Sequence, residues 1–269
     1  MSYLKDSLEK AKVARLSRLA REEGPPRPIE RTGQVLRFYD YTRTRVVGVS
    51  TEMLLRNRIV AVGEESPVNQ QFKLLRTQLF QSTRQKGINS VQVTGFEQGD
   101  GASLIAANLA ISIARDTRQT TLLVELNFRT PSIGRLFGLD PKTPGLKSYL
   151  LDGVPVEDLL LSPGIKKLTL LMAGGKIASP TELLGSPGME DLLREIKQRY
   201  EDRYIILDTP AICECADPLV LSEYVDGIIV VARANHTSRD SLKSAMDLLP
   251  KEKILGMVLN DVPDDEIGG

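Results

Sequence analysis

Short apolar runs alternate with amphipathic segments along the chain from about residue 58 onward. The runs are rich in Val, Ile and Leu and have the length of buried β-strands. They lie at 58–62, 90–95, 120–126, 167–174, 204–210, 227–233 and 254–260. Amphipathic helices are predicted at 66–86, 103–116 and 187–200. Because continuous apolar strands are buried on both faces, we predict an α/β fold with a doubly wound, mostly parallel sheet and helices on both faces.

The first part of the chain has a different pattern. Residues 2–23 place leucines along one side of a helix with lysines and arginines around them, which predicts an amphipathic helix. Residues 24–33, GPPRPIERTG, form a Pro-rich spacer that cannot continue this helix. The predicted organisation is an N-terminal helix (1–23), a linker and lead-in segment (24–57), a main domain (58–263) and a tail (264–269).

The N-terminal helix is open to three interpretations. It could contact an anionic membrane surface weakly, dock onto a partner, or remain a solvated or self-packing helix. Within residues 2–23, six Lys and Arg against four Asp and Glu leave a net charge of +2, which argues against strong membrane adhesion.

Composition argues against nucleic-acid binding, membrane-spanning segments and a structural metal site. The chain has 35 Lys and Arg and 35 Asp and Glu, so no global basic field favours nucleic acid. We find no run of about 18 apolar residues and no signal-peptide pattern, so a cytoplasmic protein is expected. Cys213 and Cys215 are too close in sequence for a mutual disulfide and are expected to be reduced. With a single histidine, His236, a soft-ligand metal site is not expected.

The stretch GFEQGDGAS lies between a predicted strand and a predicted helix, the order typical of a phosphate-binding P-loop. In such a loop, backbone N–H groups and a helix N-terminus hold phosphates, a lysine contacts the terminal phosphates, and a hydroxyl binds Mg²⁺. The residues predicted to lie at the phosphates are Gly99, Asp100, Gly101, Ala102, Ser103 and Leu104. Ser103 supplies the hydroxyl, but Ala102 replaces the lysine and Phe96 replaces the first glycine.

A second strand end is expected at the same place. YIILDTP is an apolar strand that ends in Asp208. Because the carboxyl ends of parallel strands meet at one edge of a sheet, Asp208 is expected near Ser103, where both would hold Mg²⁺. Asp208 is therefore also a candidate catalytic residue. The alternative is a strand-end residue that caps a turn.

Several segments together match the motifs of one family. They are QGDGAS (98–103) for P-G-E-G-K-S, ELNFRTP (125–131) for D-A-D-L-R-R-P, LDTPA (207–211) for I-D-T-P-P, SPTELL (179–184) for N-P-x-E-L-L, RLFGL (135–139), VDGIIVVAR (225–233) and GMVLN (256–260). Over about residues 60–262 the chain thus resembles the cytoplasmic ATPase domain of the bacterial tyrosine kinases that control polysaccharide polymerisation and export. That domain belongs to a larger group with the cell-division and plasmid-partitioning ATPases.

The resemblance implies a tyrosine kinase that uses ATP or ADP with Mg²⁺, forms a homo-oligomer and works with a membrane-embedded polysaccharide chain-length or co-polymerase protein. It also implies a catalytic role for Glu125 and an adenine contact for Asn260. The family's ring-forming motif E-x-x-R-x-x-R is represented by Gln70, Lys73 and Arg76. This segment is either a residual oligomer surface or an ordinary solvated helix face.

Four departures from the family fall on chemistry. Ala102 replaces lysine, Glu125 replaces the first aspartate of D-A-D, and Asn127, which cannot act as a base, replaces the second. No tyrosine follows Tyr224, so the tail lacks the family's phosphorylated cluster. Losing the lysine should weaken nucleotide binding about ten- to a hundredfold, since a charge-assisted hydrogen bond contributes roughly 1.5–3 kcal/mol.

These departures favour a degenerate kinase that acts as a regulatory or scaffold subunit with weak or no nucleotide turnover. An active tyrosine autokinase or ATPase is the alternative, if Arg129, Arg233 or a neighbouring subunit supplies the missing cation. A membrane-surface ATPase of the partitioning type is a third, although Glu97 stands where that group has its signature lysine. Tyr39 and Tyr41 are either substrate tyrosines or ordinary surface residues.

Overall fold

The computed structural model describes residues 44–198 and 203–263. The chain divides into two compact units, 1–42 and 43–269, and every described residue belongs to the second. Outside the described residues lie the predicted helix 2–23, the spacer 24–33, Tyr39, Tyr41 and the tail 264–269. Within them, no helix is both long and apolar enough to cross a membrane.

The second unit is built on one eight-stranded sheet with the order β1-β4-β5-β3-β6-β2-β7-β8. The strands are β1 (Arg45–Val46), β2 (Ser90–Gly95), β3 (Thr120–Glu125), β4 (Leu160–Ser162), β5 (Leu168–Leu171), β6 (Arg203–Asp208), β7 (Gly227–Arg233) and β8 (Ile254–Asn260). Neighbouring strands are parallel throughout, except that β4 and β5 are antiparallel. The predicted mostly parallel sheet is confirmed.

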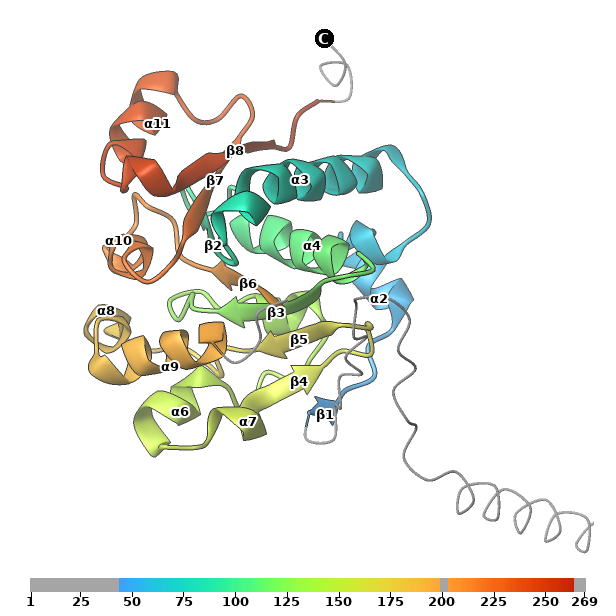
Figure 1. Ribbon diagram of the computed structural model, residues 1–269, viewed down its shortest axis with the longest axis vertical. Helices are drawn as coiled ribbons and strands as arrows, with labels where there is room; N and C mark the ends of the chain where they lie inside the picture. The colour runs from blue at the N-terminus through green and yellow to red at the C-terminus, as the bar shows by residue number, and fades with distance from the viewer. Residues whose placement is uncertain (1–43, 199–202, 264–269) are drawn as a thin grey trace, which may run out of the picture. The chain divides into compact units, whose positions relative to one another are not determined.

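Helices cover both faces of this sheet (Figure 1). They are α2 (Thr51–Arg56), α3 (Pro67–Thr83), α4 (Ala102–Ala114), α5 (Ile133–Leu136), α6 (Leu146–Asp152), α7 (Val156–Leu159), α8 (Pro180–Leu184), α9 (Pro187–Gln198), α10 (Asp217–Ser222) and α11 (Arg239–Met246), with 3₁₀ turns at η1 (Val60–Val62), η2 (Arg84–Lys86) and η3 (Lys251–Lys253). A hydrophobic core lies on each face of the sheet, and successive strand residues point alternately into one and the other. Leu123 belongs to the core under α3 and α4, and Leu122 belongs to the core under α9 and α10. The doubly wound arrangement is therefore also confirmed.

The central helix α4 explains how the sheet positions the glycine-rich stretch. Its sequence, ASLIAANLAISIA, is apolar on all sides, and a helix of that kind is stable only when it is buried. It packs between the sheet and α3, whose Arg76 Nη1 donates to the Ser112 carbonyl at 2.7 Å. Because α4 begins at Ala102, directly after the loop that follows β2, the buried helix fixes its N-terminus at that loop.

The strand predicted at 58–62 is wrong. This segment ends in the 3₁₀ turn η1, and Arg58 has a positive φ of 62° that a strand does not allow. Side chains from outside the segment bond several of its backbone groups. Asn108 of α4 accepts from the Ala61 N–H at 3.0 Å and donates to the Arg58 carbonyl at 3.1 Å. Ile59 is buried against the core without any strand pairing.

Candidate nucleotide site

The glycine-rich loop has the backbone conformation that phosphate binding requires. Gly99 and Gly101 have φ values of 97° and 91°, in the left-handed region that favours glycine. Gly101 is the N-cap of α4, so the first N–H groups of this 13-residue helix point toward the space that the loop surrounds. Ala102, Ser103 and Leu104 are the first three residues of this helix, and each is partly exposed. The loop therefore presents the anion-binding end of a helix without a lysine.

Asp100 closes this loop on itself. Its side chain is 1% exposed, and its Oδ2 accepts the Glu97 N–H at 2.8 Å. Its carbonyl accepts from Asn260 Nδ2 at 2.8 Å, which ties the end of β8 to the loop. One backbone donor of the loop is thus already paired with a carboxylate of the chain. Asn260 is placed at the loop, and its contact with adenine remains a prediction.

Asp208 is a buried carboxylate at the end of β6. It is fully buried, and among the described residues neither of its oxygens has a hydrogen-bond partner of ordinary geometry. Burial raises its pKa well above the usual value, the charge of Glu125 raises it further, and the nearby Ser103 hydroxyl opposes the shift. An unpaired buried carboxylate beside a hydroxyl fits a Mg²⁺ ion, which Ser103 and Asp208 would hold. When bound, Mg²⁺ neutralises phosphate charge.

Glu125 is the strand neighbour of Asp208, since β3 and β6 pair these two residues directly. Its carboxylate already accepts three backbone N–H groups, from Ser132 at 2.5 Å, Ile133 at 2.7 Å and Ala173 at 3.1 Å. Burial raises the pKa of Glu125, and these three bonds oppose the shift. The side chain therefore orders the loops after β3 and β5, and its catalytic role remains a prediction.

The two arginines considered as replacements for the lysine are both engaged elsewhere. Arg129 donates to both carboxylate oxygens of Asp217, at 2.8 and 3.1 Å, and to the Thr181 hydroxyl at 3.1 Å. Arg233 pairs with Asp261 at 2.6 Å. The Arg129 pair was missed in the sequence, although Asp217 before a proline is a typical start of a helix.

Within residues 44–198 and 203–263, no cluster of three or more His, Cys, Asp and Glu could hold a metal ion. Cys213 and Cys215 are free thiols. The predicted oligomer segment is also occupied within the chain, since Lys73 pairs with Glu65 at 2.7 Å and Arg76 bonds to the Ser112 carbonyl.

No protein-family model matches the chain. It is 30% identical over 209 residues to the tyrosine-protein kinase YwqD of Bacillus subtilis (strain 168), a match that covers 77% of this chain and 86% of that protein. The chain belongs to the bacterial tyrosine-protein kinase family. It is also 28% identical over 204 residues to the putative tyrosine-protein kinase CapB of Staphylococcus aureus, covering 75% and 88% of the two chains.

Solved structures of this family share the fold. The crystal structure of the chimerical protein CapA2B2 matches with a TM-score of 0.71 and 27% identity, over 81% of this chain and 93% of that one. The VpsO kinase domain matches with a TM-score of 0.66 and 28% identity, over 79% and 98%. The septum site-determining protein MinD of Pyrococcus horikoshii OT3 shares the fold alone, at 18% identity and a TM-score of 0.53. The family resemblance drawn from the motifs is confirmed.

The contact between Asn260 and the loop leads to a first prediction. Replacing Gly101 with alanine would bring its Cβ to 2.3 Å from Asn260 Nδ2, whereas a Cβ on Gly99 would meet nothing within 4 Å. Both variants pay about 1–2 kcal/mol for a left-handed alanine. Gly101→Ala must also displace the Asn260 amide, which we expect to cost about 1 kcal/mol more. Urea denaturation of the two variants measures this difference, and equal losses of stability would contradict a close contact between Asn260 and the loop.

Proposed function

We propose that this chain is a degenerate member of its family, a regulatory or scaffold subunit of exopolysaccharide or capsule polymerisation and export with weak or no nucleotide turnover. The observation that supports the proposal is that the loop has no lysine and that, in the part of the chain that the structure describes, both arginines considered as substitutes are paired with other residues. Ala102 occupies the lysine position, and Arg129 and Arg233 pair with Asp217 and Asp261.

Negative charge in the loop adds to the lack of a positive charge there. The Asp100 carboxylate accepts the Glu97 N–H, so the loop carries two acidic residues. Phosphoryl transfer depends almost entirely on positioned positive charge, so a loop with two acids and no lysine stabilises the transferred phosphoryl group poorly. The helix N-terminus, Ser103 and Asp208 remain suited to a weakly bound Mg²⁺ nucleotide.

Isothermal titration with Mg·ATP and a phosphotyrosine assay test the proposal together. We expect affinity weaker than micromolar and no phosphotyrosine on the full-length chain. Asp208→Ala is the matched control, because it removes the buried carboxylate that would hold the metal. Micromolar binding, accompanied by phosphotyrosine that disappears in Asp208→Ala, would establish an active kinase instead.

The scaffold role rests on a partner of the kind that the family resemblance implies, a membrane-embedded chain-length or co-polymerase protein. A homo-oligomer is part of the same proposal. In the source bacterium, the Asp208→Ala chain should restore polysaccharide output as fully as the unaltered chain after deletion of the gene. Restoration by the unaltered chain alone would show that catalysis is needed and would contradict a scaffold.

A further inference from the structure

A pocket of about 530 Å³ lies at the far end of α4 from the glycine-rich loop, a volume in the range of small-molecule sites. Four segments form its walls: α2 with the stretch that leads into it, the 3₁₀ turn η1, the last turn of α4 with Arg115, and the turn between β4 and β5. It shares no lining residue with the candidate nucleotide site.

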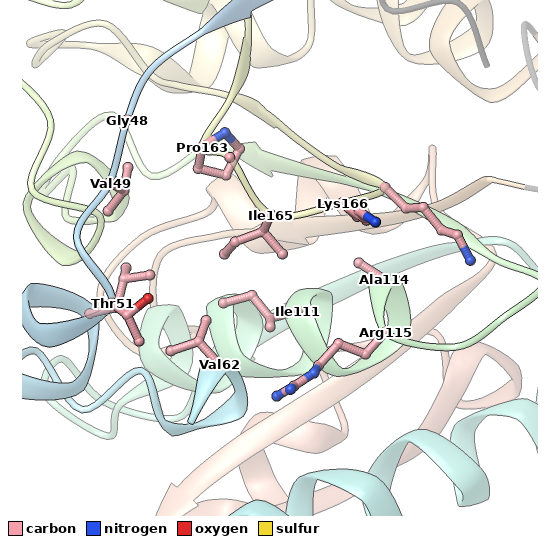
Figure 2. Close-up of a pocket in the computed structure, with 13 residues that line it drawn as sticks. Gly48, Val49, Thr51, Val62, Ile111, Ala114, Arg115, Pro163, Ile165 and Lys166 are labelled. Carbon is pink, nitrogen blue, oxygen red and sulfur yellow. The ribbon is translucent and has the colours of Figure 1, made fainter. Parts of the chain in front are cut away.

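The interior of the pocket is apolar. Val49, Val62, Ile111 and Ile165 line it, and Ile111 and Ile165 point toward one another across it (Figure 2). These side chains come from four separate segments, so the surface that they form depends on the folded chain. An apolar group of a few carbons would be removed from water here.

The rim of the pocket is positively charged. Arg115, Lys166 and Lys167 are among the lining residues, and no Asp or Glu is. Arg115 donates to the carbonyls of Ala61 and Gly63, so its charge is not neutralised by a carboxylate there.

The two lysines are likewise not paired with a described carboxylate. Lys167 Nζ donates to the carbonyls of Asp116 and Thr117, each at 2.8 Å, and Lys167 holds a positive φ of 66°. Lys166 is exposed, and none of the three cations forms an ion pair with a described carboxylate. The carboxylate of Asp116 instead accepts the Arg118 N–H and lies 3.9 Å from Arg84. The pocket is therefore a site where apolar surface and unneutralised positive charge meet.

We propose that this pocket binds a small amphipathic anion, an alkyl chain joined to a phosphate or carboxylate. The chain would lie among the four apolar side chains, and the anionic group would meet Lys166 and its neighbours at the rim. Charge complementarity decides the class, because a neutral apolar ligand would leave the cations unused and an inorganic anion would leave the apolar interior exposed to water. The site is independent of the nucleotide loop.

Titration of the full-length chain with octyl phosphate tests this proposal. We expect saturable binding that weakens at least about tenfold in Lys166→Glu, as loss of a charge-assisted contact implies. Lys142→Glu is the control, since it reverses the charge of another exposed lysine that does not line the pocket. Octanol and inorganic phosphate should each bind at least about tenfold more weakly than octyl phosphate.

Two further arms identify the site and the source of the anion. Ser103→Ala, at the nucleotide loop, should leave the affinity for octyl phosphate unchanged. Lys166-dependent binding to vesicles that contain phosphatidic acid would mark a membrane lipid as the natural ligand, and binding of octyl phosphate alone would mark a soluble one. The proposal is overturned by an absence of saturable binding up to about 1 mM, by equal effects of the two lysine variants, or by equal affinity for inorganic phosphate.

Discussion

Replacing Ala102 with lysine is expected to tighten binding of Mg·ATP by about ten- to a hundredfold, as measured by isothermal titration. Ala102 is the first residue of α4 and is partly exposed, so a long side chain there can extend over the loop without displacing buried groups. The gain corresponds to the roughly 1.5–3 kcal/mol of a charge-assisted hydrogen bond to a phosphate. A lysine at a helix N-terminus opposes the helix dipole, so the free variant should unfold at a slightly lower temperature.

Gln71→Lys is the matched control for this experiment. It adds the same charge on the exposed side of α3, away from the loop, and should leave nucleotide affinity unchanged. Unchanged affinity in Ala102→Lys would contradict the idea that the missing cation limits binding. The limit would then lie in the closure of the loop by Asp100.

A second substitution restores the family motif further. Asn127 Oδ1 accepts from the Thr130 N–H at 3.0 Å and from its hydroxyl at 3.3 Å. A carboxylate oxygen accepts both bonds equally well, so Asn127→Asp should preserve the local turn. Combined with Ala102→Lys, it tests whether phosphotyrosine formation returns along with affinity.

The fold was largely predictable because its strands are buried on both faces. The predicted bounds of β2 and β7 agree with the structure, because each strand is rich in buried valine or isoleucine and lies between turns. The run at 58–62 is also rich in apolar residues, but two of its backbone groups bond to Asn108, about 50 residues away, and not to a neighbouring strand. The short antiparallel strand β4 was not predicted, because three residues carry too little pattern.

The position of the candidate site could be predicted from the sequence, but the conformation of its loop and the partners of its side chains could not. The glycine-rich stretch and the end of a strand placed Ser103 and Asp208 at one edge, because parallel strands must end together, and the family resemblance added Asn260. The closure of the loop was not visible in the sequence, since it depends on a bond between Asn260 and the Asp100 carbonyl, 160 residues apart. The engagement of Arg129 likewise depends on Thr181 and Asp217, which lie 52 and 88 residues further along the sequence, too far for a local motif to reveal the contact.

Arg129 holds the loop after β3 to α10 and α8, so its loss should be among the most destabilising changes at the site. The Asp217 side chain is fully buried, and Arg129→Ala would leave its carboxylate without a counter-ion, which costs about 3 kcal/mol or more in buried pairs. Asp217→Asn should cost less, because the Arg129 side chain is 36% exposed and can turn to water. Arg194→Ala, in an exposed pair on α9, should cost at most about 0.5 kcal/mol.

The pH dependence of the free energy of unfolding distinguishes an ionic role of Arg129 from a role in packing alone. Burial alone would raise the pKa of Asp217, but bonds from Arg129 and Thr181 outweigh it and hold the pKa below its usual value. The pair's contribution to stability is therefore complete above the unfolded pKa of about 3.9 and is lost as the pH falls through the lower folded value. In Arg129→Ala, the arginine no longer lowers the pKa of Asp217, so burial raises it and the carboxylate takes up a proton at a higher pH. The neutral side chain then carries no unpaired charge, which removes part of the cost of the substitution. Urea denaturation should consequently show the gap between the two proteins narrowing from pH 7 toward acid, whereas a gap that does not change with pH would mean that Arg129 acts through packing alone.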